Sequence, residues 1–135
     1  LAAAHGRFGE SAGQMEDLLW YNRSLRKSRV MQESGKDVKR ALLSYEVLAY
    51  CEDRDVSLVR IRLHTGRTHQ IRVQFASRDH ALLGDRKYGA GEQDGCRIAL
   101  WSYKISFLQS GQPVTFSAAP PAEFPWNLFN LSELS

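Results

Sequence analysis

The chain has 135 residues, of which 43% are hydrophobic, and it carries a formal net charge of +3. This length and apolar content predict one globular domain, residues 1–135, with a single core. No apolar run approaches the ~20 residues of a transmembrane helix. Cys51 and Cys96 lack the spacing of metal ligands, which favours a cytoplasmic protein with reduced cysteines over a disulfide or zinc site.

The first half of the chain contains several predicted elements. Residues 1–4 (L-A-A-A) are typical of the middle of a buried strand. Three apolar residues at helical spacing predict a short helix over residues 15–21. Apolar and polar residues alternate over residues 43–49 and again over 59–63, which is typical of strands with one buried face. The charged turn between these two segments predicts an antiparallel hairpin.

The second half begins with a short predicted helix and continues with strands. Thr68 is a suitable N-cap, and Ile71 and Phe75 lie at helical spacing behind it. Three further strands are predicted over residues 98–101, 104–108 and 114–118. An aromatic segment, residues 124–131, is expected to pack back on the sheet. The fold class is therefore α+β, with a mainly antiparallel or mixed sheet and a few short helices.

Positive charge is concentrated in one part of the chain. Residues 60–89 hold seven of the eighteen Lys and Arg residues against only Asp79 and Asp85, so this segment carries +5 and the rest of the chain −2. The seven are Arg60, Arg62, Arg67, Arg72, Arg78, Arg86 and Lys87. A focused basic region on an ordered scaffold is typical of a protein that binds a polyanion such as RNA.

Residues 65–73 of this basic region read T-G-R-T-H-Q-I-R-V, and residues 84–89 read G-D-R-K-Y-G. These two motifs resemble the signature of the RluA-type pseudouridine synthases. The strand patterns around them (residues 35–48, 98–107 and 114–124) also resemble that family in the same order, so the resemblance extends over roughly residues 1–124. One departure is D-H-A at residues 79–81, where the family usually has G-H-P.

The resemblance implies a reaction and a fold. RluA-type enzymes convert uridine in ribosomal or transfer RNA to pseudouridine, without a metal or organic cofactor, and the target base must leave its stack. Arg67 matches the family arginine that pairs with the catalytic aspartate, a role that suits a permanently charged, bidentate side chain. The aspartate lies in an H-R-L-D-type motif upstream of the matching region, and no aspartate of this chain occupies such a motif.

We therefore expect residues 1–135 to be the C-terminal portion of the catalytic domain. The chain starts with Leu1 instead of Met, which agrees with this expectation. On this interpretation the fragment alone is inactive, and residues 1–4 form an exposed apolar edge where the sheet is cut.

The candidate RNA-binding residues surround Arg67. They are Arg60, Arg62, Thr65, Gly66, Thr68, His69, Gln70, Arg72, Arg86 and Lys87. Other roles remain open for some of them: Arg60 and Arg62 suit a solvated strand face, His69 and Gln70 suit hydrogen bonding around the helix start, and Arg72 suits pairing with a nearby carboxylate. Two other functions also remain open, a non-catalytic RNA-binding module and a protein-interaction domain whose basic face meets an acidic partner.

Overall fold

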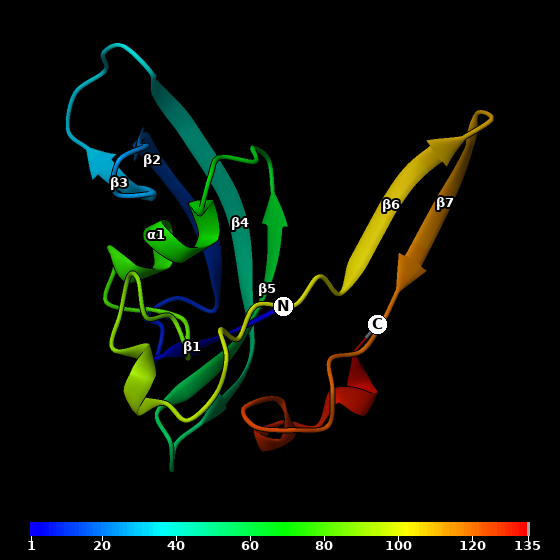
Figure 1. The fold of residues 1–135 in the computed structure, drawn as a ribbon. Helices are drawn as coiled ribbons and strands as arrows, with labels where there is room; N and C mark the ends of the chain where they lie inside the picture. Colours follow the sequence, from blue (N-terminus) through cyan, green and yellow to red (C-terminus); the bar gives the residue numbers. More distant parts are fainter. Residues whose placement is uncertain (135) are drawn as a thin grey trace.

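A five-stranded antiparallel sheet forms the centre of the structure, a computed structural model that describes residues 1–134 (Figure 1). Its strands lie in the order β1-β5-β4-β2-β3. Their bounds are β1 (Ala2–His5), β2 (Ala12–Asn22), β3 (Lys27–Met31), β4 (Val38–Cys51) and β5 (Val56–Leu63). The predicted hairpin is confirmed, because β4 and β5 pair antiparallel from Leu43↔Leu63 to Cys51↔Val56.

The helix predicted over residues 15–21 is wrong, because this segment lies inside the eleven-residue strand β2. Met15 and Leu19 are both buried, and their spacing of four residues suggested one face of a helix. A spacing of four is also even, so it places both residues on one face of a strand equally well. The backbone hydrogen bonds of this segment with β3 on one side and β4 on the other stabilise the strand.

The apolar N-terminal segment forms a buried strand, as predicted. Ala2, Ala3 and Ala4 are fully buried in β1. The expectation of an exposed edge at residues 1–4 is wrong, because the side of β1 away from β5 is covered by later segments of the chain. Ala3 N–H donates to the carbonyl of Ala99 (3.1 Å), and Leu83 N–H donates to the carbonyl of Ala3 (2.9 Å).

Both faces of the sheet are covered near β5. The helix α1 (Gln70–Ala76) lies on one face, where Phe75 packs with Val59 of β5. The C-terminal segment, with the short helices η2 (Trp126–Leu128) and η3 (Leu131–Glu133), lies on the other face, where Trp126 packs with Leu58 (Figure 1). The prediction that the aromatic segment packs back on the sheet is confirmed. No helix in residues 1–134 is long and apolar enough to cross a membrane.

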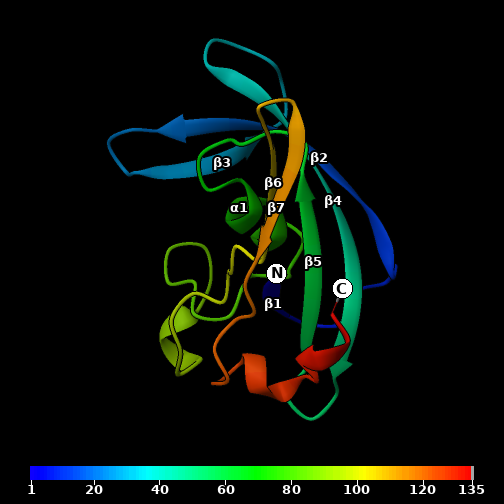
Figure 2. The same ribbon diagram turned by 90° about the vertical axis from the view of Figure 1, so that its right-hand side faces the viewer.

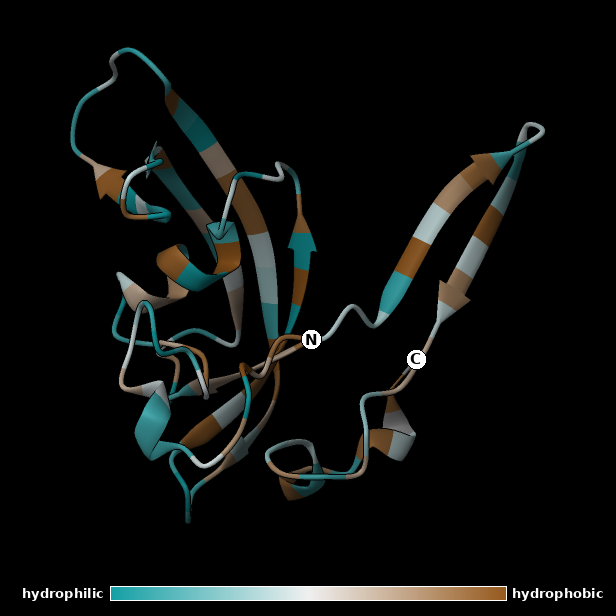
Figure 3. Ribbon diagram, in the orientation of Figure 1, coloured by the Kyte–Doolittle hydropathy of each residue, from teal (hydrophilic) through white to brown (hydrophobic). Residues whose placement is uncertain are grey.

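A separate hairpin of β6 (Lys104–Gln109) and β7 (Gln112–Ser117) extends from the body, as Figure 3 shows. It confirms two of the three predicted C-terminal strands. Cross-strand partners Ile105 and Phe116 are 58% and 59% exposed, so an apolar face of this hairpin is open. The third predicted strand, residues 98–101, is wrong, because this segment alternates its hydrogen bonds between different neighbours and forms only an isolated bridge, Leu100 to Ala2.

Candidate active site

The loop between β5 and α1 carries the first motif and is fixed by a buried glutamine. The Gln70 side chain is 3% exposed, and its Oε1 accepts hydrogen bonds from Thr65 Oγ1 (2.8 Å) and from Arg67 N–H (3.0 Å). Thr65 Oγ1 in turn accepts from the N–H of Leu42 in β4 (2.9 Å). These bonds connect the loop to the sheet, so the backbone of Arg67 has a defined position.

The guanidinium of Arg67 lies at the surface, at the end of β5. Its Nε donates to the carbonyl of Arg40 in β4 (2.9 Å), and the residue is exposed. Among residues 1–134, no carboxylate forms an ion pair with Arg67. An arginine has five N–H donors, so the four on its two Nη atoms stay available. The arrangement can receive a carboxylate that approaches from outside.

Thr68 is not the N-cap of the helix, contrary to the sequence prediction. The helix begins at Gln70 with His69 as the N-cap, and no side chain caps it. His69 has the left-handed φ of 55°, which is uncommon for a residue other than glycine but several-fold more frequent for histidine than for most. Thr68 lies before this left-handed residue, and its carbonyl accepts a hydrogen bond from Ser28 Oγ (2.6 Å).

His69 and Tyr88 bring the two motifs together. The Tyr88 hydroxyl accepts from Ser28 N–H (2.8 Å) and lies 2.7 Å from His69 Nδ1. Burial lowers the pKa of His69, and the positive charges of Arg72 and Lys87 lower it further. The neutral form of His69 is therefore favoured at pH 7, and its Nδ1 forms a hydrogen bond with the Tyr88 hydroxyl. Burial also raises the pKa of Tyr88, more than the hydrogen bond from Ser28 lowers it.

Arg72 and Asp85 form a bidentate ion pair between the helix and the second motif. Arg72 Nε lies 3.0 Å from Oδ2 and Nη2 lies 2.9 Å from Oδ1. The backbone N–H groups of Lys87 and Tyr88 also donate to Oδ1. Burial works to raise the pKa of Asp85, but these hydrogen bonds outweigh it and hold the pKa below its usual range. The alternative in which Arg72 pairs with a nearby carboxylate is thus what the structure contains.

The sequence-predicted site residues do not form one continuous surface. Arg60 and Arg62 belong to the face of β5 that also presents Leu58 to the C-terminal segment, opposite α1. Arg60 forms a surface ion pair with Glu46 (3.2 Å). Residues 65–68 lie in the loop at the end of β5.

The remaining candidates lie on the α1 side of the sheet. His69 and Arg72 come together there around Tyr88. Arg86 is an exposed residue of the second motif. Lys87 Nζ donates to the carbonyl of Arg26 (2.7 Å), a residue of the turn between β2 and β3.

The sequence-based set omits the β2–β3 hairpin, which contributes directly to this region. Ser28 supplies two of the hydrogen bonds that hold the motif loops, and Arg26 supplies the carbonyl for Lys87. A signal was present in the sequence, since residues 23–29 contain four cations and no acid. The contacts themselves join residues about 40 to 60 positions apart, which local pattern cannot reveal.

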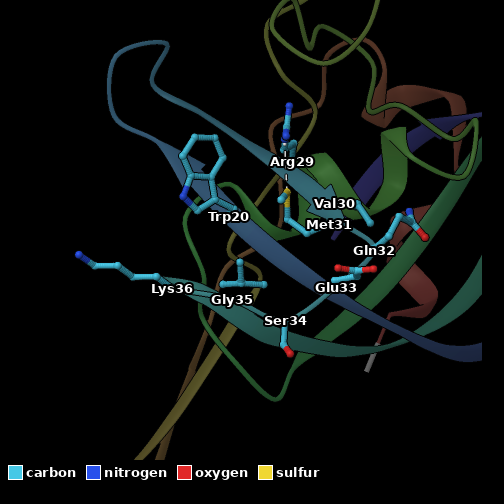
Figure 4. Close-up of a pocket in the computed structure, with 10 residues that line it drawn as sticks. Trp20, Arg29, Val30, Met31, Gln32, Glu33, Ser34, Gly35 and Lys36 are labelled. Carbon is cyan, nitrogen blue, oxygen red and sulfur yellow. Dashed lines mark hydrogen bonds between the residues drawn. The ribbon is translucent and has the colours of Figure 1, made fainter.

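Two hollows lie beside this hairpin, and Arg67 is not among the residues that line either of them. The larger has a volume of about 730 Å³ and is lined by residues of β2, β3 and the loop before β4 (Figure 4). The Arg29 guanidinium lies 5.5 Å from the centroid of the Trp20 ring at its rim. The smaller, about 300 Å³, includes Glu16 and Arg40 in its lining. Over the described part of the chain, no cluster of three or more His, Cys, Asp or Glu side chains has the arrangement of a metal site.

The fold and the site together define a class: an α+β domain with a basic surface and an arginine available to an external carboxylate. A family model described as RNA pseudouridylate synthase matches residues 7–77. This match covers more than half of the chain. The chain therefore belongs to the RNA pseudouridylate synthase family, and its similarity to curated RluA sequences assigns it to the RluA type.

Relatives and solved structures agree with this assignment. An uncharacterized RNA pseudouridine synthase of Bacillus subtilis (strain 168), YhcT, is 34% identical over 131 residues, which are 96% of this chain and 41% of the relative. The dual-specificity RNA pseudouridine synthase RluA of Escherichia coli (strain K12) is 35% identical over 109 residues, 78% of this chain and 46% of RluA.

The structure of human RNA pseudouridylate synthase domain containing 1 matches with a TM-score of 0.76 and 25% identity, covering 89% of this chain and 53% of the human one. The α+β fold class is thus confirmed. The chain spans less than half the length of the curated relatives named above.

Proposed function

We propose that the complete protein containing these 135 residues converts uridine to pseudouridine in ribosomal or transfer RNA, in the cytoplasm and without a metal or organic cofactor. Membership of the pseudouridylate synthase family supports the reaction class. The observation that carries the proposal is Arg67: its loop is fixed to the sheet, its guanidinium is exposed, and no acid among residues 1–134 pairs with it.

In this proposal a catalytic aspartate comes from a part of the protein outside these 135 residues and pairs with the Nη atoms of Arg67. The permanent positive charge of arginine keeps such a carboxylate ionised, because a nearby cation lowers a carboxyl pKa. The two parallel N–H groups also fix the direction in which the carboxylate faces the nucleotide. Arg67 therefore orients and activates the acid, and it cannot replace it.

The reaction is an isomerisation, so its atoms balance without a co-reactant. The C1′–N1 bond of the nucleotide breaks, the uracil turns, and a C1′–C5 bond forms. C5 then loses its proton, and N1 ends with one. The target base must first leave its stack, and phosphate contacts hold the flanking backbone in register. Exposed cations of the second motif, such as Arg86, are candidates for these phosphate contacts.

The test compares the complete protein with single variants on ribosomal and transfer RNA transcripts, with EDTA present. The unaltered protein is expected to form pseudouridine. Arg67→Ala is expected to reduce turnover by about 10²–10³-fold, the range for removing one preorganised electrostatic group, while RNA affinity changes little. Arg97→Ala is the matched control, because Arg97 is exposed and lies outside the candidate site. Unchanged turnover in Arg67→Ala would contradict the assignment.

The 135-residue chain alone provides a second arm of the same assay. We expect it to bind RNA in a salt-dependent way through its basic segment and to form no pseudouridine. In this isolated form it is the non-catalytic RNA-binding module considered as the alternative function. Turnover by the isolated chain would mean that one of its own acids performs the chemistry, and the role proposed for Arg67 would then be wrong.

A further inference from the structure

The hairpin of β2 and β3 carries a dense group of cations. From Leu18 to Gln32 the sequence contains four basic residues and no acidic one. We call this group the hairpin cations: Arg23, Arg26, Lys27 and Arg29. All four are exposed, and within residues 1–134 none forms an ion pair with a carboxylate. Their charge is therefore not neutralised by the protein and is available to an anionic partner.

The backbone of this hairpin is fixed against both sequence motifs of the candidate site. Ser28 N–H donates to the hydroxyl of Tyr88, and Ser28 Oγ donates to the carbonyl of Thr68. Lys87 Nζ donates to the backbone carbonyl of Arg26. Figure 2 shows the hairpin of β2 and β3 projecting beside α1. The hairpin cations thus have a defined position relative to the Arg67 loop.

These contacts use backbone atoms or aromatic faces and leave the cationic groups available. Lys87 binds only the carbonyl of Arg26, so the Arg26 guanidinium takes no part in that bond. The Lys27 ammonium lies 5.3 Å from the centroid of the Tyr88 ring. Arg29 lies over the Trp20 ring and donates from Nε to the Met31 sulfur, and its Nη atoms remain. Such cation–π contacts position the groups without neutralising them.

We infer that the hairpin cations bind the phosphate backbone of the RNA that flanks the target uridine. This inference rests on the proposed function, and it adds a surface that lies outside both motifs. The contact between Lys87 of the second motif and Arg26 of the hairpin places cations of the motif and of the hairpin next to one another. Unpaired cations on an ordered hairpin next to a site that handles one nucleotide suit contacts to phosphates, which fix register without reading sequence.

The experiment measures the salt dependence of RNA binding by the complete protein. The triple variant Arg23→Gln, Arg26→Gln, Arg29→Gln keeps Lys27 and all backbone contacts. The control variant removes the same charge elsewhere: Arg54→Gln, Arg97→Gln, Lys104→Gln, three exposed residues outside the β2–β3 hairpin. The probe is a fluorescently labelled RNA stem-loop with a single-stranded loop, titrated at several KCl concentrations.

The slope of log K against log [KCl] counts the phosphates neutralised, at about 0.7 per contact for single-stranded RNA. This slope is negative, because binding weakens as salt rises. If each arginine contacts one phosphate, the triple variant loses three contacts, and the slope is expected to become less steep by about 2. The control variant is expected to keep the slope of the unaltered protein. The triple variant is also expected to raise KM for RNA.

The outcomes separate this inference from the proposed function. Pseudouridine formation by the unaltered protein tests the function alone. If it fails while the triple variant still lowers the slope, the hairpin inference stands and the function does not. An unchanged slope in the triple variant, or an equal loss in the control, overturns the hairpin inference. Loss of binding to a poly-glutamate peptide without loss of binding to RNA would also overturn it, because the surface would then suit an acidic protein.

Discussion

Replacement of Arg72 by methionine is expected to destabilise the protein by about 3 kcal/mol at pH 7. The Asp85 side chain is fully buried, and Arg72 provides two of its four hydrogen bonds. Removing one partner of a buried ion pair typically costs about 3–5 kcal/mol. The lower end applies here, because the N–H groups of Lys87 and Tyr88 still donate to the carboxylate and because Arg72 is 23% exposed.

The size of this loss should depend on pH. In the unaltered protein the pKa of Asp85 is below its usual range, so Asp85 contributes stability above its unfolded pKa of about 3.9 and loses it as pH falls through the folded pKa. Without Arg72, burial is expected to raise the pKa of Asp85 above the unfolded value. The buried carboxylate of the variant then takes up a proton as the pH falls, which removes the cost of its unpaired charge. The difference in the free energy of unfolding between the two proteins therefore becomes smaller from pH 7 to pH 4.

Urea denaturation followed by tryptophan fluorescence at both pH values measures this difference. Arg62→Met is the matched control, since Arg62 is exposed and has no carboxylate partner among residues 1–134. It should change stability by less than about 0.5 kcal/mol. An Arg72→Met variant as stable as the control at pH 7 would refute the reasoning. A loss that stays the same at pH 4 would show that Asp85 is not the buried charge responsible.

Strands and motifs were predictable where one local pattern allowed only one structure. Alternation over residues 43–49 and 59–63 gave the β4–β5 hairpin correctly, because a period of two is incompatible with a helix. Spacing alone could not distinguish helix from strand in β2, where Met15 and Leu19 share a face in either structure. Pairing with β3 and β4 makes this segment a strand, and those partners lie elsewhere in the sequence.

The candidate site was only partly predictable for a related reason. The motif around Arg67 identified the loop, but Gln70, a side chain from the first turn of α1, closes that loop by accepting from Arg67 N–H. The division between Arg60, on the face opposite α1, and Arg72, on α1 itself, follows from the path of the chain between them. The two arginines add equally to the net charge of residues 60–89, and that net charge contains no information about which face of the sheet a residue occupies.

Two further substitutions test the second motif. Gly84→Ala should destabilise the protein by about 1–3 kcal/mol, because Gly84 has φ +76° and an added Cβ would overlap the backbone of Arg97. The control is Gly66→Ala, whose added Cβ meets open space and should change stability by less than about 0.5 kcal/mol. Equal thermal stability of the two variants would contradict this prediction. Tyr88→Phe should cost about 1–3 kcal/mol in urea denaturation, because the Ser28 N–H, on a residue only 2% exposed, loses the hydroxyl that accepts its hydrogen bond. The same hydroxyl connects the β2–β3 hairpin to the motif loops. The Tyr88→Phe variant should therefore also show faster amide hydrogen exchange at Ser28. Unchanged hydrogen exchange at Ser28 would mean that the other contacts alone hold the hairpin.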